Sequence, residues 1–238
     1  MVKANKEKSD PKASISDSDN LTQKAYIGLR RMLFMNEISP GHKIHYRDMA
    51  EKMQMSPTPI IHALKWLEFQ GLVRHERNRG FFLEPVSLDE INEIFDLREQ
   101  LEVGLLPKVL ENLNSNRIEK LRCILQKYKT AAQEDQHKQK TMAAVEFHIA
   151  LASISNSLIT CRMLRTLFDL VYLKYQVDIF LPRPAKDTAD YHQKILDFIE
   201  AKDLKGARQT LSQDIRTVRK VGIDALIRRT EEKENVIF

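Results

Sequence analysis

The sequence predicts a mainly α-helical chain in two parts: three helices and a β-hairpin, followed by an antiparallel bundle of helices. Three observations predict this fold class. Apolar residues recur at helical spacing over most of the chain, the pattern becomes extended only near residues 72–85, and no further strand signal follows. At 238 residues, the chain is also long enough for two modest domains with separate cores.

Composition is that of a globular protein, with 42% apolar and 30% charged residues. No apolar run approaches the roughly 20 residues that span a bilayer, and the N-terminus lacks the apolar stretch of a secretory signal. We therefore expect a cytoplasmic protein without membrane contact. Cys123 and Cys161 form no CxxC pair, so the sequence suggests neither a disulfide framework nor a thiolate zinc site.

Positive charge is concentrated in one segment. Residues 21–83 carry ten Lys and Arg against five acidic residues, whereas residues 84–238 carry 24 against 24. A polyanion is held by concentrated positive charge, because binding releases its condensed counterions. The asymmetry indicates nucleic acid as the partner of this segment, although five charges are few enough to arise by chance.

The first element is a helix that follows a polar tail. Residues 1–18 are rich in Lys, Ser and Asp and almost free of large apolar residues, so we expect them to be flexible. From Leu21 onward, apolar residues recur at helical spacing, and this helix ends before Pro40.

Two shorter helices follow. The second runs from Arg47 to Met53, and the third from Pro57 to about Phe69. We expect the Ser56 side chain to cap the third helix, and proline at the first helical position loses no hydrogen bond. Gly71 supplies the left-handed residue that ends it.

A β-hairpin follows the third helix. The segments LVRHE and FFLEP are extended in pattern, residues 77–80 form the corner between them, and Pro85 closes the unit. This order of elements is typical of a winged helix-turn-helix, which we assign to residues 19–85.

A helical domain occupies residues 86–230. Ser87 and Glu90 predict a capping box at its start. Long helical segments with short breaks and no strand signal favour an antiparallel bundle of six or seven helices. The predicted breaks lie at Gly104 and Pro107, Asn114–Ser115, Asn156–Ser157, residues 181–184 and Lys202–Asp203.

Five segments in this order resemble the GntR family of bacterial regulators, in its FadR-like branch with an FCD effector domain. They are RDMAEKMQMSPTPIIHALKWLEFQGLV, RHERNRGFFLEPVS, DLREQLE, FHIALASISN and YHQKILDFIEAKDLKGARQTL, and the resemblance covers residues 20–225. It implies a transcriptional regulator, commonly a repressor. Such a homodimer places two recognition helices in successive major grooves of a palindromic operator in double-stranded DNA. It also implies an effector, commonly a carboxylate metabolite, that changes how the DNA-binding heads are presented.

The outer face of the third helix should face the major groove of the DNA. The family usually has arginines at the positions of Pro57 and Ile61 and a glutamate at the position of His62. The operator of this protein should therefore differ in sequence from the operator that is common in the family. His62 and Trp66 have an alternative role, packing against the first helix or the wing. The predicted base-facing residues are Ser56, Thr58, Ile61, His62 and Lys65.

A second group should position the protein on the DNA backbone. Arg47 matches a family position that contacts DNA from the second helix. Arginine–phosphate contacts fix register without reading sequence, and a glycine lets the wing tip approach closely. For each arginine, a solvated surface charge is the alternative. The wing residues are Arg77, Asn78, Arg79 and Gly80.

A metal site is implied by the resemblance, in altered form. Family members with a metal use an Asp and a His one helical turn apart and two later His. Here His148 and His192 match, while Ala144 and Asp214 stand at the other two positions. His148, His192 and Asp214 would bind one divalent ion such as Zn, Mn, Ni or Fe. The alternative is a metal-free pocket in which both histidines form hydrogen bonds.

The effector pocket should include Arg98, because a guanidinium suits a carboxylate. Its alternative is a salt bridge to Glu102 on the same helix. Further pocket candidates are His148, His192, Asn156, Arg162 and Tyr172.

Two other functions compete with regulation. One is a metal-dependent enzyme built on His148, His192 and Asp214, but the sequence has no nucleophile elbow, glycine-rich phosphate loop or HExxH helix, so we predict no catalytic activity. The other is a module that uses the winged helix for protein contacts only. It would show no salt-sensitive affinity for DNA.

Overall fold

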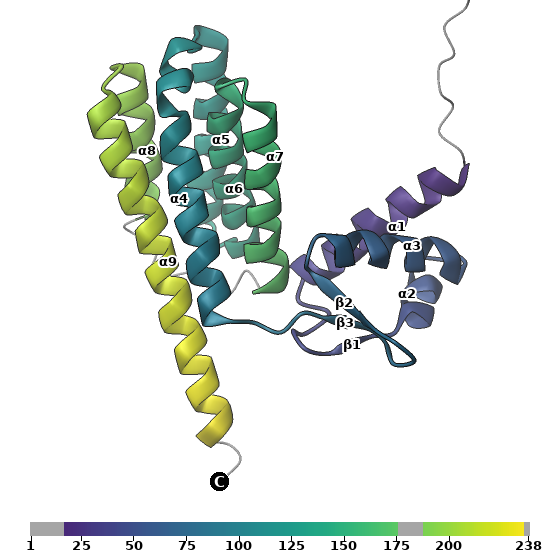
Figure 1. Cartoon of the computed structure of the whole chain (residues 1–238). Coiled ribbons are helices and arrows are strands. Elements are labelled where there is room, and N and C mark those ends of the chain that lie inside the picture. The colour runs from purple at the N-terminus through teal and green to yellow at the C-terminus, as the bar shows by residue number, and fades with distance from the viewer. Residues whose placement is uncertain (1–16, 176–187, 236–238) are drawn as a thin grey trace, which may run out of the picture.

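The computed structural model describes residues 17–175 and 188–235. In this part of the chain, a small domain of three helices and three strands lies beside a bundle of six helices (Figure 1). The predicted fold class is therefore confirmed. No described helix is both long and apolar enough to span a bilayer.

Three helices build the N-terminal domain: α1 (Asp17–Phe34), α2 (Tyr46–Lys52) and α3 (Pro57–Phe69). The apolar faces of α1 and α3 pack against each other, and their central side chains are fully buried. This core fixes which face of α3 remains outside. Its innermost residues are Ala25, Leu29, Leu33, Ile60, Ala63, Leu64 and Leu67.

The ends of α3 differ in part from the prediction. Pro57 occupies the first turn and Gly71 has a φ of +75°, as predicted. The Ser56 side chain, however, makes no capping hydrogen bond, so that prediction is wrong. A capping oxygen accepts from the second or third helical N–H, and Pro59 at the third position has none, so only the Thr58 N–H is left as a donor.

A three-stranded antiparallel sheet forms the wing. Its strands are β1 (Lys43–Ile44), β2 (Val73–Glu76) and β3 (Gly80–Leu83), in the order β1-β3-β2. The predicted hairpin is β2–β3, which pairs Val73 with Leu83 and turns through Asn78 at a φ of +63°. The sequence analysis missed β1, because two residues show no alternating pattern.

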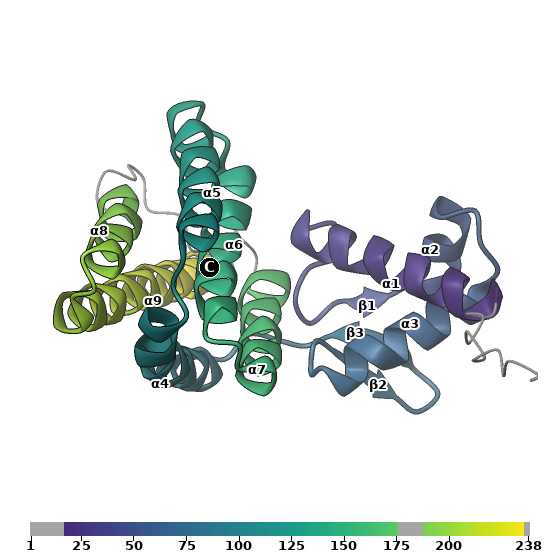
Figure 2. The same ribbon diagram turned by 90° about the horizontal axis from the view of Figure 1, so that it is seen from above.

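The helical bundle is formed by α4 (Leu88–Glu111), α5 (Ser115–Gln133), α6 (His137–Ile154), α7 (Leu158–Asp169), α8 (Thr188–Glu200) and α9 (Leu204–Asn235). The helices pack as neighbours, with α4 and α8 against α9 and α5 against α6. A short π-helix, η1 (Leu170–Lys174), continues α7. Figure 2 shows the N-terminal domain to one side of the bundle, next to α7.

The predicted breaks near residues 114, 156 and 202 are confirmed as helix boundaries, whereas residues 181–184 lie outside the described part. The breaks predicted at Gly104 and Pro107 are wrong, because α4 continues through both. Its neighbours Leu105, Leu106 and Val109 are buried, and this packing keeps the helix intact despite the lost hydrogen bond. A break that was not predicted separates α5 from α6, where Asp135 has a φ of +54°.

Only half of the predicted capping box forms at the start of α4. Ser87 Oγ accepts a hydrogen bond from the Glu90 backbone N–H at 3.4 Å. The Glu90 carboxylate instead pairs with Lys174 and lies 2.8 Å from the Tyr175 hydroxyl, which itself accepts from the Ser87 N–H at 3.3 Å. The interdomain linker is thereby fastened to the end of η1.

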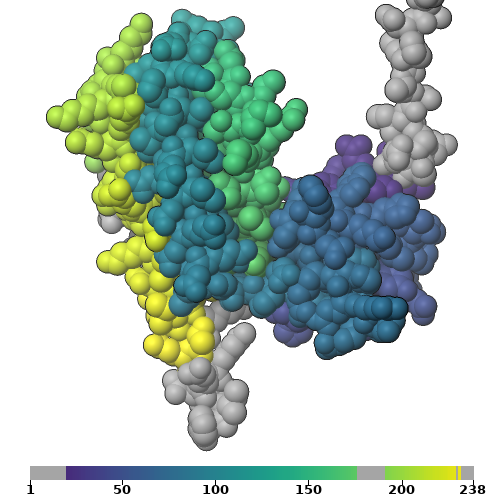
Figure 3. Space-filling view, viewed as in Figure 1, coloured from purple at the N-terminus to yellow at the C-terminus, as the bar shows by residue number. Residues whose placement is uncertain are grey.

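The two domains share side chains along α1 and η1. Leu173 of η1 is buried in the core of the N-terminal domain, and Leu170 packs beside it. Arg30 of α1 binds Asp169 through two bonds of 2.5 and 2.6 Å. Figure 3 shows the N-terminal domain in contact with the bundle.

Candidate DNA interface and effector site

One face of α3 is largely exposed. Thr58, His62 and Lys65 are exposed, as is Ser56 before the helix, while Ile61 is half-buried and packs against the N-terminal core. The structure thus brings the five predicted base-facing residues to one side of the domain. They remain predicted contacts, and Ile61 presents less of its side chain than the others.

Trp66 follows the alternative that the sequence left open. Its ring meets the edge of Tyr26 with centroids 5.7 Å apart, although 46% of the residue is exposed. Tyr26 is in turn joined to Gln70 by a hydrogen bond of 2.9 Å. Trp66 therefore helps to fix α3 against α1.

The wing tip and the start of α2 enclose a shared cavity of about 360 Å³. Arg47, Asn78, Arg79 and Gly80, predicted from distant parts of the sequence, all line it. Lys43 of β1 lines it too, and was missed because β1 was missed. One acid, Asp48, also lines the cavity, but the three cations outnumber it, and such a concave surface suits a phosphate of the DNA backbone.

Contacts within the wing restrain its arginines unequally. Arg79 pairs with Glu76 and lies 5.3 Å from the centre of the Phe82 ring. Arg74 makes the same two kinds of contact. Arg77 is exposed and has no ion pair within the described residues. Arg77 is therefore freer to move than Arg79.

In the bundle, His148, His192 and Asp214 meet although they come from α6, α8 and α9. His148 Nε2 lies 3.2 Å from His192 Nε2 and 3.2 Å from Asp214 Oδ2, and His192 Nε2 lies 3.5 Å from the same oxygen. All three side chains are buried. We call these three residues the histidine–aspartate cluster.

A chain of charges connects this cluster to Arg98. Glu102 Oε2 lies 2.6 Å from His148 Nδ1, and Glu102 Oε1 accepts from Arg98 Nε at 3.0 Å. Residues four apart share one face of α4, which is why both side chains point inward. The salt bridge that was the alternative role of Arg98 is present, yet Arg98 Nη1 is buried without a hydrogen-bond partner in the described residues.

The charged groups that connect Arg98 to the cluster shift one another's pKa values. Burial opposes the charged form of His148, but Glu102 and Asp214 outweigh it and raise the pKa of His148 to about 9. Burial likewise opposes the ionised carboxyls, but His148 and Arg98 lower the pKa of Glu102, and the two histidines lower that of Asp214. The two carboxylates therefore favour the protonated form of His148 when no metal is bound.

Aromatic rings surround Arg98 and the cluster. The Arg98 guanidinium carbon lies 4.0 Å from the centre of the Phe168 ring, and the rings of Phe168 and Tyr172 are nearly parallel. Tyr172 is buried here, as expected of a pocket residue. Phe168 was missed, because nothing in its local sequence separates it from other core residues.

Asn156 and Arg162 are not brought to the cluster. Asn156 is exposed at the end of α6, where it bonds to Asn112 and Arg117. Arg162 is exposed on α7, whose buried face carries Cys161, Leu164 and Phe168. Neither position supports the predicted contact with an effector.

The cluster fits a metal ion in its donor atoms and its spacing. Two imidazole nitrogens and one carboxylate are common ligands of divalent transition metals, and in a tetrahedral site with bonds of about 2.0–2.1 Å the ligand atoms lie roughly 3.3 Å apart. The three separations match that value. Both Asp214 oxygens are buried without a well-aligned hydrogen-bond donor in the described residues, which a metal ion would remedy.

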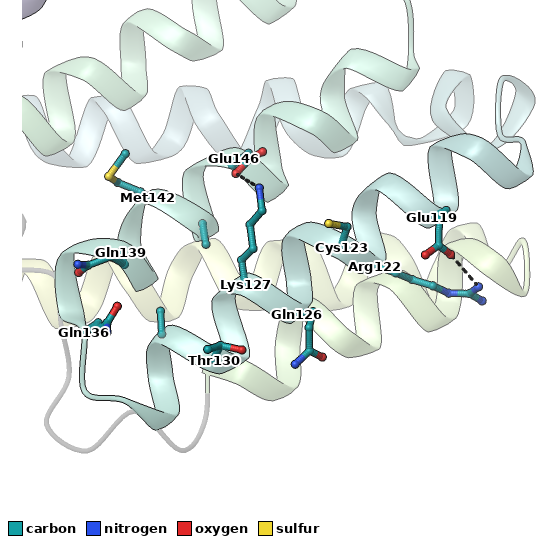
Figure 4. A pocket seen from close by; sticks show the side chains of 12 residues that line it. Glu119, Arg122, Cys123, Gln126, Lys127, Thr130, Gln136, Gln139, Met142 and Glu146 are labelled. Atoms are coloured by element: carbon teal, nitrogen blue, oxygen red, sulfur yellow. Dashed lines mark ion pairs between the residues drawn. The ribbon is translucent and has the colours of Figure 1, made fainter.

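A separate groove of about 810 Å³ lies between α5 and α6 (Figure 4). Polar side chains such as Gln126, Thr130 and Gln139 line much of it, and ion pairs join Lys127 to Glu146 and Arg122 to Glu119. None of the predicted site residues lies there. Although this groove is large, we do not assign the effector site to it.

Both domains match known protein families. Residues 21–83 match the gntR family of bacterial regulatory proteins, and residues 93–217 match the FCD domain. The chain is 24% identical over 196 residues to the HTH-type transcriptional regulator McbR of Escherichia coli (strain K12), covering 82% of this chain and 89% of McbR. It is 22% identical over 185 residues to the uncharacterised HTH-type transcriptional regulator YdhC of Bacillus subtilis (strain 168), covering 77% and 83% of the two chains.

Solved structures share the fold. The structure of Escherichia coli McbR has a TM-score of 0.76 at 24% identity, covering 88% of this chain and 98% of that one. The structure of Lar, which controls the Listeria monocytogenes agr system, has a TM-score of 0.60 at 18% identity, covering 85% and 96%. With both domains matched in order, the chain belongs to the GntR family of bacterial regulatory proteins, as a DNA-binding transcriptional regulator with an FCD effector domain.

Proposed function

We propose that this regulator is a homodimeric repressor of a palindromic operator, and that a small organic acid held in the bundle releases it from DNA. We divide it at residues 85 and 86 into the DNA-binding and effector domains. The observation that carries the effector part is the buried Arg98, which has an unsatisfied Nη1 beside the histidine–aspartate cluster. As a DNA-binding regulator, it would act in the cytoplasm.

Arg98 is prepared for an anion. Its Nε is used by Glu102 and its flat face by Phe168, so Nη1 remains for a ligand. A buried donor without a partner destabilises a protein by roughly 1–3 kcal/mol, which a bound acceptor recovers. A carboxylate matches the planar guanidinium and carries the opposite charge.

The cluster would hold one divalent ion through His148, His192 and Asp214. When bound, such an ion supplies open coordination positions to an oxygen of the effector. Glu102 orients His148 by accepting from its Nδ1, as outer carboxylates do for metal-binding histidines. Metal binding needs neutral imidazoles, so the proton of His148 would be released.

On DNA, α3 of each subunit would enter the major groove, with the two copies in successive grooves. Ser56, Thr58, His62 and Lys65 would face the bases. The cavity shared by Arg47, Arg79 and Lys43 would hold a backbone phosphate. A catalytic role for the cluster is not needed to explain any of these features, and the named relatives are transcriptional regulators.

The metal is tested by purifying the protein without chelators and measuring bound ions by elemental analysis. We expect about one divalent ion per chain, retained by Glu146→Ala and lost by His148→Ala and Asp214→Ala. Glu146 is a matched control because it is an exposed acid two residues from His148. Equal metal content in all four proteins would contradict the assignment of ligands.

The carboxylate is tested by thermal unfolding with lactate, succinate and citrate. At least one should raise the melting temperature of the native protein, and Arg98→Lys should weaken that shift because Lys cannot reproduce the planar fork. If a carboxylate stabilises a protein that contains no metal, and the effect depends on Arg98, the carboxylate site is supported and the metal site is rejected. Stabilisation unaffected by Arg98→Lys would reject the role of Arg98.

A further inference from the structure

A second cavity, of about 720 Å³, lies where the two domains meet. It is bounded by α1 from the N-terminal domain and by α6, α7 and η1 from the bundle. Its volume is within the range of about 300–1,000 Å³ that holds small organic ligands. Most of its wall is apolar, formed by Phe34, Met35, Val145, Ile149, Phe168 and Leu173.

The charged residues of this interdomain cavity do not balance. Its two acids have partners, since Asp169 binds Arg30 and Glu146 pairs with Lys127 at 3.7 Å. Two arginines on its wall, Arg31 and Arg165, are exposed and have no ion-pair partner within the described residues. The cavity thus combines an apolar wall with two uncompensated cations.

This cavity is distinct from the histidine–aspartate cluster but adjoins it. None of His148, His192 and Asp214 lines it. It shares Phe168 and Tyr172 with the surroundings of the cluster, and Phe168 lies directly beneath the Arg98 guanidinium. An occupant of the cavity would press on the same two rings that frame the effector site.

We propose that the interdomain cavity is a second ligand site, which takes an amphipathic organic anion with an apolar body and a single acidic head. The apolar body lies against Phe34, Ile149 and Phe168, and the head is held by Arg31 and Arg165. Because its walls come from both domains, an occupant also fixes the position of α1 against the bundle. The site does not depend on the proposed metal or on the effector at Arg98.

Decanoate is the probe, with titration calorimetry of the full-length protein as the readout. We expect saturable binding of decanoate, weakened about five-fold by Arg31→Gln or Arg165→Gln, the effect of one partly solvated ion pair. Arg162→Gln should leave the affinity unchanged. Arg162 is a matched control because it is an exposed arginine on the same helix, α7, outside the cavity.

A second pair of variants tests the apolar wall. Ile149→Trp should fill the cavity and abolish binding, whereas Leu158→Trp, at an exposed position of α7, should not. Uncharged 1-decanol should bind equally to the native protein and to Arg165→Gln, since it lacks the head that the arginines hold.

Three results would overturn the proposal. Decanoate could fail to bind, or Arg162→Gln could weaken it as much as Arg165→Gln does. Arg98→Lys could abolish binding while the Arg31 and Arg165 variants retain it, which would assign decanoate to the effector site instead. Loss of the metal or of the carboxylate response at Arg98 leaves the expected decanoate result unchanged, so the two proposals fail separately.

Discussion

Arg98 shows how one residue can serve two roles that the sequence presented as alternatives. The motif DLREQLE places Glu102 four residues after it, which predicts a salt bridge on one helix face. The structure has that bridge through Nε alone, and Nη1 remains buried and unsatisfied. A guanidinium has five N–H donors in a fixed fork, so an internal partner does not exclude an external one.

Two variants separate base reading from backbone positioning on DNA. Arg79→Ala should weaken binding to every DNA sequence by a similar factor and lower the salt dependence by about one ion, because it would remove the phosphate contact that we propose for Arg79. His62→Ala should instead change the order of preference among operator variants, if His62 faces the bases as we propose. Fluorescence anisotropy with a set of operator sequences at several salt concentrations measures both effects.

Arg208→Ala is the control for these measurements, because Arg208 is an exposed arginine of α9, far in sequence from the winged helix. It should leave both the affinity and the salt dependence unchanged. If Arg79→Ala and His62→Ala had equal effects on all sequences, the division of labour between wing and recognition helix would be rejected.

The limits of sequence reasoning are clear at single residues. Nothing in the spacing of His148, His192 and Asp214 shows that α6, α8 and α9 meet, so the cluster was predicted only through the family resemblance. The exposed position of Arg162 was predictable, however. Cys161, Leu164 and Phe168 recur at helical spacing as the buried stripe of α7, and Arg162 lies off that stripe.

At the scale of elements, strong periodicity was a reliable guide and local exceptions were not. The long helices and the hairpin follow from repeated apolar positions. Strand β1 has two residues and depends on pairing with Phe81 and Phe82, which are almost 40 residues away in sequence. Helix α4 passes through Pro107 because buried neighbours hold it, and such tertiary packing leaves no mark on the local sequence.

Substitution by alanine should change the free energy of unfolding in opposite directions at two glycines. Gly71→Ala should lower the free energy of unfolding by about 1–2 kcal/mol, because a side chain is strained at its φ of +75°. Gly104→Ala should raise it by about 0.5–1 kcal/mol, since Gly104 lies within α4 and a Cβ there meets no atom within 4 Å. Urea unfolding measures both, and the same sign for both variants would contradict this account.

At the scale of the whole molecule, one ion pair joins the DNA-binding domain to the bundle. Arg30 and Asp169 are each less than a third exposed, and two bonds connect them. Burial opposes the charge on Arg30, yet Asp169 outweighs it and raises the pKa of Arg30. A partly buried, bidentate pair contributes more than an exposed one.

A double-mutant cycle with Arg30→Ala and Asp169→Ala should give a coupling of about 1 kcal/mol in the free energy of unfolding. Arg122 and Glu200 form the comparison, as a bidentate pair within the bundle in which Arg122 is more exposed. Their coupling should be smaller and should fall further with added salt. A negligible coupling for Arg30 and Asp169 would mean that the pair adds nothing to the stability of the domain contact.

The burial of Leu173 in the other domain's core has a consequence for protein engineering. A chimeric biosensor could be built by cutting this regulator at its linker and joining the DNA-binding domain to a foreign sensor domain. A cut after residue 85 would remove Leu170 and Leu173 from the hydrophobic centre that they help to complete. The isolated DNA-binding domain would then expose part of its hydrophobic core. A transferable DNA-binding unit of this regulator would therefore need two segments, the N-terminal domain and η1, which covers that core.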